Sequence, residues 1–96
     1  MTKTYAAAEK AARLLNMPLE YASGFPRVQL DGYGTVRVEA HRGVRAYAQD
    51  CVELGARGAL IRVRGKRLEL RRLSAELAVI CGTINCVELV YEEGAR

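Results

Sequence analysis

Residues 35–47 have the sequence Thr35-Val36-Arg37-Val38-Glu39-Ala40-His41-Arg42-Gly43-Val44-Arg45-Ala46-Tyr47. In the first half of this segment apolar and charged side chains alternate at every second position, which predicts a half-buried strand. Gly43 supplies a position where the backbone can turn, and the alternation resumes from Val44. The segment therefore predicts two short strands joined by a corner at His41-Arg42-Gly43.

The same period of two extends over a β region at 27–91. We expect about eight short strands, at 27–31, 35–40, 44–48, 51–54, 59–64, 67–73, 77–81 and 83–91. Turn residues such as Asp31-Gly32, Gly65-Lys66 and Gly82 separate them. Because parallel strands need long crossover connections, these tight turns favour antiparallel pairing. The predicted fold is mainly β (α+β), with an N-terminal helix followed by a curled antiparallel β-meander.

Gly65 and Gly82 each stand between two apolar strand segments and give a faint internal repeat of 17 residues. Such a repeat also fits a small β-solenoid-like stack of rungs, which remains an alternative. Two units are too few to establish a solenoid, so we prefer the meander.

The N-terminal segment, residues 1–16, differs from the rest of the chain. A helix is predicted over 2–16, because alanines favour it, Thr2 or Thr4 can cap it, and Pro18 follows its end. Its apolar face consists of Tyr5, Ala8, Ala12 and Leu15. We expect this helix to pack on a larger element, the alternative being that it lies on a membrane surface.

The composition predicts a single domain over 1–96 with a modest core. Half of the residues are hydrophobic but only six are aromatic, so the core should consist mainly of Val, Leu, Ile and Ala. The sequence contains no apolar run near the ~20 residues of a membrane span and no signal-peptide-like start, so we expect a cytoplasmic chain. Three cysteines without a close pair agree with a reducing compartment.

The sequence offers no catalytic group of residues. A single histidine, His41, cannot form a His-rich metal site, and Cys51, Cys81 and Cys86 lack the spacing of a zinc site. Gly32-Tyr33-Gly34 joins two predicted strands, whereas a phosphate-binding loop leads into a helix. We therefore expect no enzyme, no metal and no cofactor.

A basic band occupies residues 57–72, where seven basic residues against one acidic residue give a net charge of +6 within a chain of net charge +4. Alternation predicts that its arginines point outward on one sheet face, namely Arg62, Arg64, Arg67 and Arg71. Such a face can be merely solvated, or it can contact a protein or an anionic membrane surface. Nucleic acid is less favoured, because no aromatic residues are interleaved for base stacking.

The corner also has two interpretations. It can be purely structural, with Arg42 pairing with a nearby acid such as Glu39, or it can present His41 and Arg42 to a partner. The predicted partner-binding residues are therefore His41, Arg42, Arg62, Arg64, Arg67 and Arg71.

An ordered series of short motifs spans roughly residues 15 to 90. The motifs are Leu15-Asn16-Met17-Pro18, Pro26-Arg27-Val28-Gln29-Leu30-Asp31-Gly32, Val38-Glu39-Ala40-His41-Arg42-Gly43, Ile61-Arg62-Val63-Arg64-Gly65, Leu68-Glu69-Leu70 and Cys81-Gly82-Thr83-Ile84. Together they resemble the YabP/YqfC family of sporulation proteins, and most closely its YqfC branch. The specificity lies in their order, since no single tripeptide is distinctive. One departure is Ala40, where the family often has Asn.

The resemblance implies a non-enzymatic sporulation factor in the mother cell of a spore-forming bacterium. YqfC-like proteins are often encoded beside a membrane protein of the YqfD type, and the related YabP proteins are associated with formation of the spore cortex or coat. We therefore expect docking on such a membrane partner, or on the anionic lipid surface around the forespore. There are two alternatives: a nucleic-acid-binding module and a self-assembling structural scaffold. Partners in the second case would include further copies of the chain, as a homo-oligomer.

Overall fold

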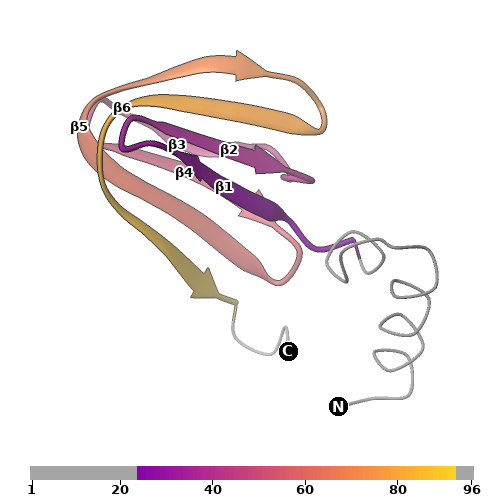
Figure 1. The fold of residues 1–96 in the computed structure, drawn as a ribbon. Helices are drawn as coiled ribbons and strands as arrows, with labels where there is room; N and C mark the ends of the chain where they lie inside the picture. Colours follow the sequence, from indigo (N-terminus) through magenta and orange to yellow (C-terminus); the bar gives the residue numbers. More distant parts are fainter. Residues whose placement is uncertain (1–23, 93–96) are drawn as a thin grey trace.

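The computed structural model describes residues 24–92, which form one open antiparallel sheet (Figure 1). Its six strands are β1 (Arg27–Asp31), β2 (Thr35–Glu39), β3 (Val44–Tyr47), β4 (Cys51–Ala56), β5 (Ala59–Leu73) and β6 (Leu77–Tyr91). Their order across the sheet is β1-β2-β6-β5-β4-β3. The helix predicted over 2–16 lies outside the described residues. The predicted antiparallel β region is confirmed.

The long hairpin of β5 and β6 organises the sheet, and both strands bend near their midpoints (Figure 1). On one side of the bend, 77–81 of β6 pairs with β2; on the other, 59–64 of β5 pairs with β4. At the bend the pairing register of β5 and β6 shifts: Lys66 pairs with Thr83 and Glu69 with Cys81. Two residues of β5, Arg67 and Leu68, therefore lie opposite the single residue Gly82 of β6. The bend divides the sheet into two halves.

The two halves enclose one apolar core. Alternate residues of β2, β4, β5 and β6 point into it, as the sequence period predicts. The most deeply buried are Val36, Val38, Val52, Leu54, Ile61, Val63, Leu68, Ala78 and Ile80. Cross-strand register places Val36 beside Ile80 and Val38 beside Ala78. The expected core of Val, Leu, Ile and Ala is confirmed for the described residues.

Three features of the predicted β region are wrong. The strands number six instead of about eight, because 59–64 and 67–73 form one strand and 77–81 and 83–91 form another. Gly65 and Gly82 bend these strands instead of ending them. The sheet is open and not curled, and it is not a simple meander, since β2 lies beside β6. Antiparallel pairing throughout the described strands also disagrees with a solenoid-like stack.

Candidate functional site

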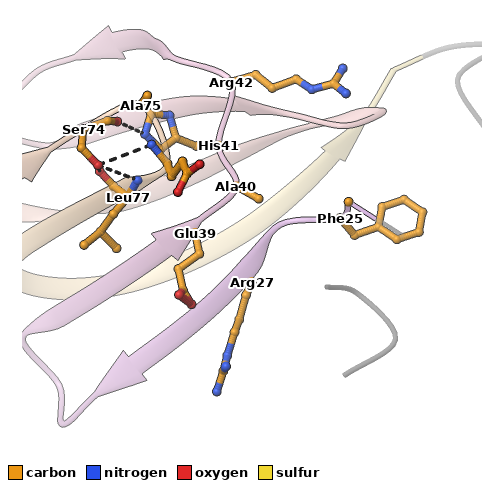
Figure 2. A pocket seen from close by; sticks show the side chains of 11 residues that line it. Phe25, Arg27, Glu39, Ala40, His41, Arg42, Ser74, Ala75 and Leu77 are labelled. Carbon is orange, nitrogen blue, oxygen red and sulfur yellow. Dashed lines mark hydrogen bonds between the residues drawn. The ribbon is translucent and has the colours of Figure 1, made fainter. Parts of the chain in front are cut away.

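The corner at His41-Arg42-Gly43 joins β2 to β3 and contacts the turn between β5 and β6. His41 is 7% exposed and is the buried polar side chain of residues 24–92. Its Nε2 lies 2.8 Å from the carbonyl oxygen of Ser74 (Figure 2). The Gly43 N–H donates to its Nδ1 at 2.9 Å. Because Nδ1 accepts, Nε2 carries the proton and donates to Ser74. A neutral imidazole thus joins the two turns with both nitrogens.

Backbone hydrogen bonds hold the same corner on both sides. The Ala40 N–H donates to the Glu76 carbonyl at 2.8 Å, and the Arg42 N–H donates to the Gly55 carbonyl at 2.7 Å. The Ser74 hydroxyl accepts the Leu77 N–H at 3.1 Å, which closes the opposing turn. The corner is therefore fixed by contacts with β4 on one side and with the β5–β6 turn on the other, and this favours the structural interpretation of His41.

Ala40 has a φ of 62°, in the left-handed region that side chains other than Gly, Asn and Asp rarely adopt. We expect Ala40→Gly to raise the free energy of unfolding by about 0.5 kcal/mol, because relief of strain exceeds the entropy cost of glycine. The control is Ala46→Gly on β3, an exposed alanine without a positive φ. That variant should lose about 0.5–1 kcal/mol in urea denaturation. A loss at both positions would contradict the prediction.

A hollow of about 560 Å³ lies beside the corner (Figure 2). It is lined by the corner itself, by the turn at 74–77 and by the residues that lead into β1, including Phe25 and Arg27. Figure 2 shows the side chains of Arg42 and Glu39 pointing in different directions, so the predicted pairing between them is not formed. Arg42 extends outward and is accessible to a partner, whereas His41 is not.

Arg62 and Arg64 form an ion-pair network on the outer face of β4, β5 and β6. Arg62 Nε lies 2.7 Å from Glu53 Oε2, and its Nη1 lies 3.1 Å from Glu88 Oε1. Arg64 Nε lies 3.2 Å from the same Glu88 oxygen. Hydrogen bonds from Arg62 and Arg64 lower the pKa of Glu88, and those to Glu53 and Glu88 raise the pKa of Arg62. Two carboxylates therefore neutralise half of the predicted basic face.

Arg67 lies in the bend of β5, and Arg71 lies beyond it, on the other half of the strand. The bend at Gly65 separates Arg71 from Arg62 and Arg64 along β5, and the single arginine face stays a prediction. Arg71 Nε lies 3.0 Å from Glu69 Oε1, and this hydrogen bond raises the pKa of Arg71. Arg67 is exposed in the register shift, with a φ of 54°.

Strand pairing brings a further cation to this second half. Arg37 of β2 and Arg72 of β5 both pair with Val79 of β6, which lies between them. The two arginines are therefore two strand spacings apart, about 10 Å between their Cα atoms. Neither side chain has an ion pair within residues 24–92. We call Arg37, Arg67, Arg71 and Arg72 the basic outer face. Sequence reasoning missed Arg37 and Arg72 as site residues, because the pairing of β2 with β6 leaves no local signal.

The described part of the chain contains no cluster of three or more His, Cys, Asp or Glu side chains able to hold a metal ion. Within the same range, no helix has the length and apolar character needed to cross a bilayer. In comparisons with known proteins, no family model matches the chain, and neither a curated protein nor a solved structure matches it significantly.

Proposed function

We propose that the chain is a non-enzymatic sporulation factor of the YqfC type. It acts in the cytoplasm of the mother cell and docks on a membrane partner of the YqfD type, at the membrane around the forespore, during formation of the spore cortex or coat. The motif series in the sequence supports the process. One structural observation supports docking through the basic outer face: Arg37 and Arg72 have no ion pair in residues 24–92, whereas Arg62 and Arg64 are paired.

The chemistry of the basic outer face favours an acidic protein segment as the partner. Guanidinium groups bind carboxylates through paired hydrogen bonds, and here two of them project from strands held about 10 Å apart. Val79 lies between them and adds a small apolar contact. Within residues 24–92 the basic outer face has no aromatic residues between its arginines. Nucleic-acid binding by base stacking is therefore a poorer explanation of this face than binding of an acidic protein segment.

The test compares two double variants that remove the same charge. In Arg37→Ser/Arg72→Ser the basic outer face loses two cations that have no ion pair within residues 24–92. In Arg62→Ser/Arg64→Ser two cations that are paired with Glu53 and Glu88 are lost instead. Because an exposed charge contact contributes about 0.5–1 kcal/mol, the first variant should bind the partner's cytoplasmic segment about tenfold more weakly. A fluorescent fusion of it should leave the forespore membrane, while the second should remain there.

Equal recruitment of both variants would contradict docking through this face. Nucleoid-associated signal that disperses with salt would instead indicate a nucleic-acid-binding module. Large species whose size is unaffected by either double substitution would indicate a scaffold assembled through exposed strand edges. Light scattering at low and high salt separates these two outcomes.

A further inference from the structure

The inner side of β1 carries apolar residues that the core does not cover. Val28 pairs with Val38 and Leu30 with Val36, so both point to the same side as these buried valines. Yet Val28 is 36% exposed and Leu30 is 56% exposed. Because β1 is an edge strand, the inner apolar surface continues past the core and ends open to solvent.

The C-terminal half of β6 presents a matching surface. Leu89 pairs with Ile61 and Tyr91 with Ala59, so these side chains also point inward, but they are 50% and 58% exposed. Between β1 and β6, a hollow of about 230 Å³ is lined by Leu30 of β1 and by Val87 of β6. We call this opening the apolar mouth, formed by Val28, Leu30, Val87, Leu89 and Tyr91.

We propose that the apolar mouth is the docking site for residues 2–16 of the same chain. The chain enters β1 at Arg27, the residue directly before Val28 of the mouth. A helix over 2–16 is about 22 Å long and the strand segment 84–91 about 26 Å, so their lengths match. The connection 17–26 spans up to about 35 Å, enough to return the helix across the opening.

The sequence of this segment suits the mouth. Its predicted apolar face combines Tyr5 and Leu15 with two alanines, and small side chains allow a helix to approach a flat sheet closely. A tether of ten residues gives an effective concentration in the millimolar range. At protein concentrations below the millimolar range, residues 2–16 of the same chain therefore occupy the mouth in preference to residues 2–16 of a second copy. The inference is independent of the proposed function, since the basic outer face lies on the opposite side of the sheet.

Paramagnetic relaxation tests the position of the segment directly. A spin label is attached at Lys10→Cys, opposite the predicted apolar face, in a full-length chain whose three native cysteines are replaced by serine. We expect the amide signals of Leu30 and Leu89 to lose most of their intensity, while those of Ala46 and Tyr47 on β3 keep theirs. Unchanged signals at Leu30 and Leu89 would overturn the proposal. So would a loss seen only when label and isotope are on different chains, which would identify a second copy.

A matched pair of substitutions adds a second readout. Leu15 lies on the apolar face, whereas the adjacent Leu14 is rotated by 100° around a helix. We expect Leu15→Asp to expose the mouth and raise the fluorescence of a hydrophobic dye several-fold, and Leu14→Asp to leave it near the wild-type level. Both changes cost similar helix propensity, so equal dye binding by the two variants would overturn the proposal.

Discussion

Gly82→Ala is expected to lower the free energy of unfolding by about 4 kcal/mol, a large part of the stability of a domain this size. Two costs add. Gly82 has a φ of 146°, a backbone conformation that strains other residues by about 1–3 kcal/mol. A Cβ there would also lie 2.8 Å from the Arg67 carbonyl oxygen and 2.9 Å from that of Lys66. These are backbone atoms of the bend, so relieving the overlap costs a further 1–3 kcal/mol, roughly.

Gly43→Ala is the matched control for this prediction. Gly43 also has a positive φ, 101°, but a Cβ there would meet nothing within 4 Å. This variant should therefore show only the conformational cost, about 1–2 kcal/mol. Urea denaturation followed by circular dichroism measures both values. Equal losses at the two positions would mean that close approach of the backbones does not set the bend.

The bend also explains which parts of the fold the sequence could predict. Strand positions were predictable because the period of two is local: the predicted strand at 27–31 coincides with β1. A glycine inside an apolar pattern, however, is typical of both a turn and a bend. Gly65 approaches Thr83 of β6, and Gly82 approaches the Lys66 and Arg67 carbonyls of β5. The two glycines therefore belong to one bend only because β5 pairs with β6, and neither local sequence encodes that pairing.

The candidate site was predictable to a similar degree. Alternation correctly placed Arg62 and Arg64 on the outside of β5, but it could not supply their partners. Glu53 and Glu88 come from β4 and β6 and meet Arg62 only through the pairing of three strands. The same non-local pairing places Arg37 opposite Val79 and so adds an arginine from β2 to the basic outer face. The surface charge pattern therefore depends on topology, which local periodicity does not determine.

His41→Ala is expected to lower the free energy of unfolding by about 3 kcal/mol. The substitution leaves the Ser74 carbonyl and the Gly43 N–H without their partner. An unsatisfied buried group costs about 1–3 kcal/mol, and these two groups are partly buried. The hollow beside the corner admits some water, which keeps the total near the lower part of that range. Urea denaturation should show a lower midpoint with an unchanged m-value.

Arg42→Ala is the neighbouring control and separates the two interpretations of the corner. The Arg42 side chain points away from His41 into solvent, so its truncation should change stability by less than about 0.5 kcal/mol (Figure 2). If the corner is structural, only the His41 variant is destabilised and the Arg42 variant still docks. If the corner presents both residues to a partner, both variants lose docking while the His41 variant stays as stable as the wild type. The buried, doubly hydrogen-bonded imidazole favours the first outcome, in which His41 holds the two turns together.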